Sequence, residues 1–114
     1  MFTQKDFNSI DRSYFTVHHA GCYGVTLQSK NTHHSWYITS EDYGSFKTCT
    51  IMHSHGAPNT PMHTHGHGKT LRSCIRQIKS HDEYQLAKDA KKRQYNRNRR
   101  RDARIEADDL TTAI

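Results

Sequence analysis

In the first part of this chain, histidine is the residue type whose number and spacing best suit metal binding. The sequence holds ten histidines, among them a His-x-His pair and, eight residues after it, a His-x-His-x-His run. Alternate residues of a strand point to the same side, so each run can present two imidazoles together. Neutral imidazole nitrogens bind zinc, nickel and copper. The candidate ligands for zinc or another transition metal are His53, His55, His63 and His65.

The same histidines also fit a polar loop that holds no metal and titrates near its ordinary pKa of about 6.5. We therefore expect no cofactor, with zinc or another transition metal as the alternative. The segment MHSHGAP resembles the metal-binding motif of JAMM-type peptidases, but Gly56 stands where that motif has proline and the Ser and Asp expected downstream are absent. No complete catalytic set is visible, so we expect a protein that is not an enzyme.

A second group of candidate functional residues lies near the C-terminus, and these residues are positively charged. Residues 88–104 contain nine lysines and arginines and only two aspartates, a net charge of +7. In a helix with about 100° per residue, five of the arginines share one face. Guanidinium groups match the bidentate geometry of phosphate, and a tyrosine can stack on a base. The predicted nucleic-acid contacts are Lys91, Lys92, Arg93, Tyr95, Arg97, Arg99, Arg100, Arg101 and Arg104. An acidic protein partner and a merely solvated helix face remain alternatives.

These residues need elements to position them, and the pattern predicts an α+β fold. Thr3 and Asp6 form a capping pattern that predicts a short N-terminal helix. Short runs of β-branched and aromatic residues with polar connectors predict an antiparallel sheet of three to four strands. These runs cover 14–18, 23–28, 34–39 and 46–53. Residues 54–68 hold both prolines and predict a loop.

After that loop, apolar residues at helical spacing predict one helix packed on the sheet, followed by a basic C-terminal helix. The packed face consists of Leu71, Cys74, Ile75 and Ile78. The apolar spacing stops there, while helix-favouring residues continue. We therefore predict a compact α+β domain over 1–81 and an arginine-rich helical tail over 82–114.

Composition narrows the class of protein further. The chain contains three widely spaced cysteines, an odd number that favours reduced thiols, with Cys49 and Cys74 in the core. The first residues lack the apolar run of a signal peptide, and no stretch approaches the ~20 apolar residues of a membrane span. We expect a cytoplasmic protein without a membrane partner, and the oligomeric state stays open.

The run YNRNRRRDAR, residues 95–104, resembles the arginine-rich RNA-binding peptides of phage antiterminators. The general layout, a nearly neutral domain with a basic tail, is similar to small basic proteins of phages and other mobile genetic elements, including anti-CRISPR proteins. This resemblance implies a binding protein that engages nucleic acid or a nucleoprotein complex and inhibits a host defence nuclease such as a CRISPR effector. The alternatives are a small histidine-dependent metal-binding nuclease or hydrolase, and a protein–protein adaptor.

Overall fold

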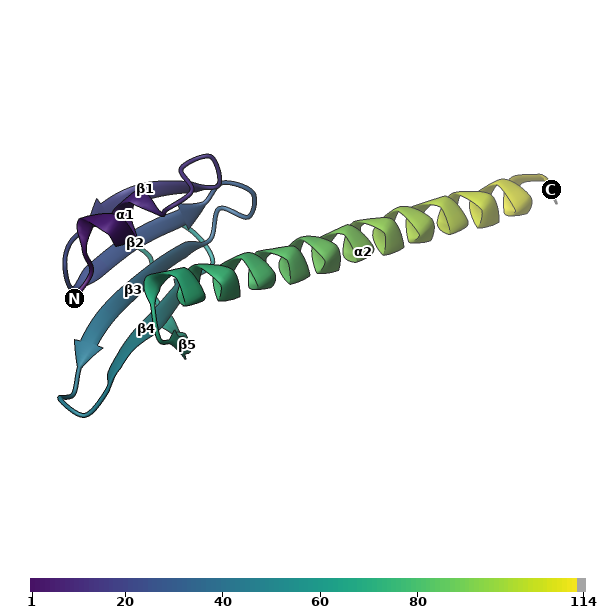
Figure 1. The fold of residues 1–114 in the computed structure, drawn as a ribbon. Helices are drawn as coiled ribbons and strands as arrows, with labels where there is room; N and C mark the ends of the chain where they lie inside the picture. Colours follow the sequence, from purple (N-terminus) through teal and green to yellow (C-terminus); the bar gives the residue numbers. More distant parts are fainter. Residues whose placement is uncertain (113–114) are drawn as a thin grey trace. The chain divides into compact units, whose positions relative to one another are not determined.

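Five antiparallel strands, arranged side by side in sequence order, form the sheet of this protein (Figure 1). The computed structural model describes residues 1–112. Its strands are β1 (Phe15–Ala20), β2 (Gly24–Ser29), β3 (Ser35–Asp42), β4 (Lys47–Ser54) and β5 (His63–Gly68). A short helix, α1 (Gln4–Asn8), precedes the sheet, and a long helix, α2 (Leu71–Thr112), follows it. The predicted α+β class, with an antiparallel sheet and a short N-terminal helix, is confirmed.

The chain divides into two units, Met1–Asp82 and Glu83–Ile114. The first, called here the sheet unit, contains the sheet, α1 and the first turns of α2. The second, called the helical unit, contains the rest of α2. Helix α2 is unbroken because no glycine or proline interrupts its sequence. The residues of the predicted packed helix and of the predicted basic helix therefore belong to one continuous element.

The core of the sheet unit lies on one face of the sheet. Alternate residues of β2, β3 and β4 are buried, as expected for strands with one face against a core. The apolar face of α2 joins them, and its predicted members Leu71, Cys74, Ile75 and Ile78 are all buried. Cys49 is also buried, and burial raises the pKa of the Cys74 thiol to about 12. Cys22, in contrast, is exposed.

The strand count is the main correction, because residues 63–68 form β5 where the sequence predicts a loop. This strand reads HTHGHG and offers no apolar alternation, so only its backbone pairing with β4 defines it. Its glycines let α2 come close. A Cβ atom added to Gly68 would lie 2.6 Å from the Cys74 sulfur, and one added to Gly66 would lie 3.3 Å from the side-chain oxygen of Gln77.

Candidate functional site

Six of the ten histidines gather at one end of the sheet. Because the strands are antiparallel, the start of β3, the end of β4 and the start of β5 meet at that end. Nine pairs of rings among these histidines have centroids between 4.7 and 6.1 Å apart. We call them the histidine cluster: His34, His53, His55, His63, His65 and His81.

His53 lies at the centre of the histidine cluster. In the strand register it pairs with Trp36 of β3 on one side and with His63 of β5 on the other. Its ring stacks on the Trp36 indole at 4.0 Å with an interplanar angle of 13°. The residue is only 1% exposed, so its imidazole is part of the core rather than of the surface.

A bulge in β5 adds a further histidine to the cluster. Ile51 pairs with Gly66 and Met52 pairs with Thr64, which leaves His65 as the extra residue. The His65 ring lies 4.8 Å from the His81 ring and 5.3 Å from Trp36. After the bulge the alternation changes, and His67 instead contacts Thr50, outside the cluster.

His34 and His81 reach the cluster from other parts of the fold. His34 ends the turn between β2 and β3, where His33 has a φ of 63° and the Ser29 amide donates to the His34 carbonyl. The Nδ1 atom of His34 lies 2.9 Å from Nε2 of His53. His81 comes from α2, and its ring lies 4.9 Å from that of His53. The sequence pattern found neither of these two residues. Of the four predicted ligands, His53, His55 and His63 bring their ligand atoms together, whereas His65 lies beside His53 and His81.

Asp82, the residue after His81, ties α2 to the sheet. Its carboxylate accepts hydrogen bonds from the hydroxyls of Tyr14 at 2.8 Å, Ser29 at 2.6 Å and Thr32 at 3.0 Å. The Ser29 oxygen accepts in turn from the Trp36 indole at 3.1 Å. Asp82 is fully buried. Because Thr32 belongs to the turn that carries His34, one carboxylate fixes the backbone beside both His34 and His81.

Three histidines of the cluster, His53, His65 and His81, have lowered pKa values, which favour the neutral form of their rings. Burial, reinforced by the neighbouring imidazoles, lowers the pKa of His53 to about 3. Burial is also the main cause of the lowered pKa values of His65 and His81. A neutral imidazole offers a lone pair, and this is the form that binds metals. Two triads have ligand atoms within 4.8 Å of one another: His34 with His53 and His81, and His53 with His55 and His63.

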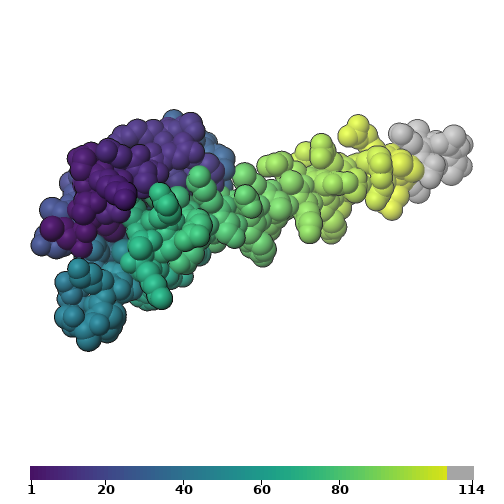
Figure 2. All heavy atoms as spheres, viewed as in Figure 1, coloured from purple at the N-terminus to yellow at the C-terminus, as the bar shows by residue number. Residues whose placement is uncertain are grey.

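The predicted nucleic-acid contacts all lie on α2 in the helical unit. Every side chain from Ala90 to Ala107 is exposed. Figure 2 shows one face of this part of α2. The five arginines of the predicted face, called here the arginine stripe, are Arg93, Arg97, Arg100, Arg101 and Arg104. Arg101 lies 3.9 Å from Asp102, and the Arg99 guanidinium lies 6.0 Å from the Tyr95 ring centroid. Both contacts are at the surface, so the arginine stripe faces solvent and is accessible to a large anion.

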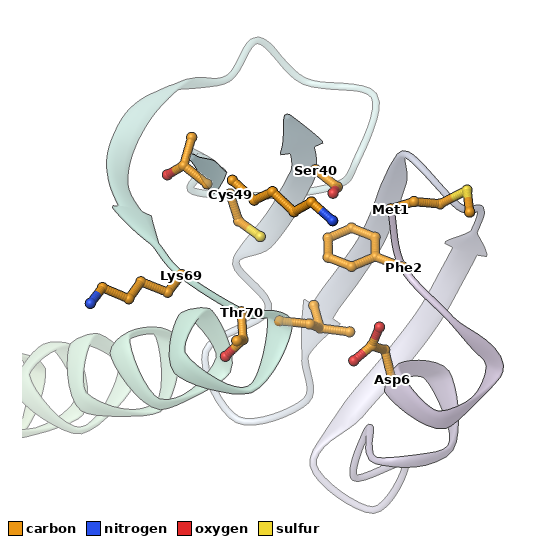
Figure 3. A pocket seen from close by; sticks show the side chains of 10 residues that line it. Met1, Phe2, Asp6, Ser40, Cys49, Lys69 and Thr70 are labelled. Atoms are coloured by element: carbon orange, nitrogen blue, oxygen red, sulfur yellow. The ribbon is translucent and has the colours of Figure 1, made fainter. Parts of the chain in front are cut away.

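A pocket of about 140 Å³ lies at the other end of β3, β4 and β5 from the histidine cluster (Figure 3). Ser40, Cys49, Thr70 and the two N-terminal residues line it, together with the side chains of Asp6 and Lys69. Its mixed polar and apolar lining shows no convergent catalytic group. Among the helices of the described residues, none is both long and apolar enough to cross a membrane.

Comparison of the chain with protein-family models, with curated proteins and with solved structures gave no match. The histidine cluster and the arginine stripe are therefore the features of the molecule that bear on its function.

Proposed function

We propose that this protein binds nucleic acid, or a nucleoprotein complex, through the arginine stripe. The observation that supports the proposal is a run of five exposed arginines on one face of α2, within a segment of net charge +7. Like charges at helical spacing repel one another, and phosphates would relieve that repulsion. Arginine in place of lysine favours bidentate contact with phosphate oxygens.

The length of the arginine stripe suits a nucleic-acid backbone. A helix rises about 1.5 Å per residue, so Arg93 and Arg104 are separated by about 16 Å along its axis. A DNA duplex carries one charge per roughly 1.7 Å of axis, so several phosphates fall within that length. Tyr95 is exposed and adds an aromatic surface on which an unpaired base can stack.

Two matched triple variants of the full chain test this proposal. The stripe variant carries Arg93→Gln, Arg97→Gln and Arg104→Gln. The control variant carries Arg72→Gln, Arg76→Gln and Lys88→Gln, which removes the same charge from exposed positions of α2 outside the predicted contacts. Binding to labelled single-stranded RNA, duplex RNA and duplex DNA is measured at several salt concentrations.

The plot of log K against log salt has a negative slope, and each lost phosphate contact reduces the steepness of that slope by about 0.7 to 0.9. We expect the stripe variant to lose about 2 to 3 from that slope and the control variant clearly less. Equal losses would mean that only total charge matters, and the arginine stripe would not be the site. If the unaltered protein binds none of the three at low salt, direct nucleic-acid binding is wrong and an acidic protein partner is the next candidate.

The resemblance to anti-CRISPR and related proteins of mobile elements suggests one partner for this proposal, a host defence nuclease that works on nucleic acid. The protein would then inhibit cleavage by occupying a nucleic-acid-binding surface or the nucleic acid itself. In a cleavage assay with a CRISPR effector, the unaltered chain should inhibit and the stripe variant should not. Equal inhibition by both would mean that inhibition does not depend on the arginine stripe.

The histidine triads favour a second candidate, a metal-dependent nuclease or hydrolase. Many such enzymes place a carboxylate general base beside the metal-bound water. Asp82 is next to His81 in the chain but is fully buried and already accepts three hydrogen bonds. It is therefore engaged in the fold, which favours binding over catalysis. Zinc-dependent degradation of RNA or DNA that disappears in a His81→Gln variant would support the enzyme instead.

A further inference from the structure

We propose that His34, His53 and His81 form a binding site for a transition-metal ion of the zinc class, which joins α2 to the sheet. This site is separate from the arginine stripe, and it differs from the ligand set that the sequence pattern predicts. Only His53 belongs to both sets. The site would be structural, because its ligands come from three different elements of the sheet unit.

The geometry of this triad is close to that of a metal site. Zinc–nitrogen bonds of about 2.0–2.1 Å in a tetrahedral site place ligand nitrogens roughly 3.4 Å apart. In the protein, the ligand atoms of His34, His53 and His81 all lie within 4.8 Å of one another. One pair, His34 Nδ1 and His53 Nε2, lies 2.9 Å apart in a ring–ring hydrogen bond, which a bound ion would replace. Small side-chain rotations would therefore suffice to place three nitrogens around one ion.

An unsatisfied atom supports the same site. Nδ1 of His81 is buried and has no hydrogen-bond partner within the described structure. A buried polar atom without a partner is costly, and native proteins rarely retain one without a reason. A metal ion bound at the cluster would give the imidazole of His81 a ligand role and offset the cost of burying it.

The surroundings hold the ligands in place. Asp82 fixes α2 beside His81, and through Thr32 it fixes the turn that carries His34. His53 is held by its stacking on Trp36. Rigid support of this kind, outside the ligands themselves, is what tunes metal affinity in proteins.

The alternative triad, His53 with His55 and His63, is less suited to a structural ion. His55 and His63 are exposed, so water satisfies their nitrogens without a metal. Both triads use His53, so a single ion occupies one of them. The ring of His55 lies 4.9 Å from that of His34 and 4.7 Å from that of His53, but its ligand atoms group with those of His53 and His63 and not with the buried triad.

The test uses the full chain without an affinity tag, stripped with a chelator and then titrated with Zn²⁺ against a chromophoric chelator. Co²⁺ serves as a second probe, since its visible absorption distinguishes tetrahedral from octahedral coordination. The test variants are His34→Gln and His81→Gln. The matched controls are His18→Gln and His67→Gln, which remove exposed histidines outside the cluster and keep the histidine number equal.

We expect one tightly bound equivalent of Zn²⁺, a tetrahedral Co²⁺ spectrum and a higher melting temperature with metal. His34→Gln and His81→Gln should weaken Zn²⁺ binding by more than the roughly 10- to 100-fold typical of outer-shell changes, and the controls should bind normally. A His81→Cys variant adds a check that does not depend on losing a ligand. Its thiolate should keep the ion and give the Co²⁺ complex a sulfur charge-transfer band.

Three results would overturn the proposal. One is the absence of saturable binding at one equivalent. Another is equal weakening in all four glutamine variants, which would indicate nonspecific binding to many histidines. The third is loss of binding in His55→Gln and His63→Gln but not in His34→Gln and His81→Gln, which would assign the ion to the exposed triad. Unfolding of each variant by urea in chelator shows whether it folds without metal.

Discussion

Removing the Asp82 carboxylate should destabilise the sheet unit more than any other single acidic substitution in it. Asp82 is fully buried and accepts hydrogen bonds from the hydroxyls of Tyr14, Ser29 and Thr32. These donors belong to the segment before β1, to β2 and to the turn after β2. The carboxylate therefore connects α2 to three places at once, and an alanine would leave all three donors without their acceptor.

The magnitude follows from those three hydrogen bonds. A buried donor that loses its acceptor costs about 1–3 kcal/mol. Ser29 is fully buried, so we count about 2 kcal/mol for its hydroxyl. Tyr14 and Thr32 are half-buried and regain water, so each counts for about 1 kcal/mol. Asp82→Ala should lower the free energy of unfolding by about 4 kcal/mol, and Asp82→Asn, which keeps the shape and one neutral acceptor, by about 2 kcal/mol.

Urea unfolding followed by tryptophan fluorescence measures this effect directly. The chain has one tryptophan, Trp36, and its indole donates to the Ser29 oxygen that contacts Asp82. Chelator in the buffer keeps metal binding from changing the apparent stability. Asp102→Asn is the control, because Asp102 is exposed and should change stability by less than about 0.5 kcal/mol. A loss below about 1 kcal/mol in Asp82→Ala would refute the reasoning, since it would mean that the three donors find other partners.

Two further predictions concern β5 and the histidine cluster. Gly68→Ala should cost about 1–3 kcal/mol in urea unfolding, because its Cβ would lie 2.6 Å from the Cys74 sulfur, whereas Gly56→Ala meets nothing within 4 Å and should be nearly neutral. Equal effects of the two substitutions would contradict the packing of α2 on β5. The metal-free protein should lose stability as the pH falls from about 6.5 toward 3, because the lowered His53 pKa of about 3 means that the unfolded chain binds a proton that the folded chain does not. From pH 6.5 down to pH 5, the free energy of unfolding should fall by at least about 1 kcal/mol per pH unit. A free energy of unfolding that does not change over this range would contradict a buried, neutral His53.

The sequence predicted the sheet where side chains alternate and missed it where they do not. Leu27, Trp36 and Ile51 stand on the buried side of β2, β3 and β4, as their alternation indicates. β5 has only histidine, threonine and glycine, and its pairing with β4 comes from backbone hydrogen bonds. Prolines nearby favoured a loop. Where glycine occupies the strand positions that face α2, no apolar side chain marks the buried face, so hydrophobic periodicity does not reveal the strand.

The start of α2 was predictable, and so in part was Asp82. Cys74 and Ile78 mark a helical spacing whose next positions are His81 and Asp82. The apolar side chains end at Ile78, but a polar residue at the next position of the same helix face still indicates burial. A buried carboxylate needs partners, and those partners are hydroxyls from residues 14, 29 and 32, which no local pattern connects with residue 82.

The histidine cluster shows why spacing alone finds only part of a site. His53, His55, His63 and His65 are visible in the sequence because they repeat at every second residue. Antiparallel pairing of β4 with β5 places His53 opposite His63, and the bulge in β5 adds His65. His34 and His81 belong to the cluster only because a turn and a helix are fixed by Asp82. The buried triad needs those two residues, so a site assigned from repeated histidines favours the exposed ligands and omits the buried ones. In the proposed buried site, two of the three ligands, His34 and His81, are brought to His53 by the tertiary fold and not by sequence spacing.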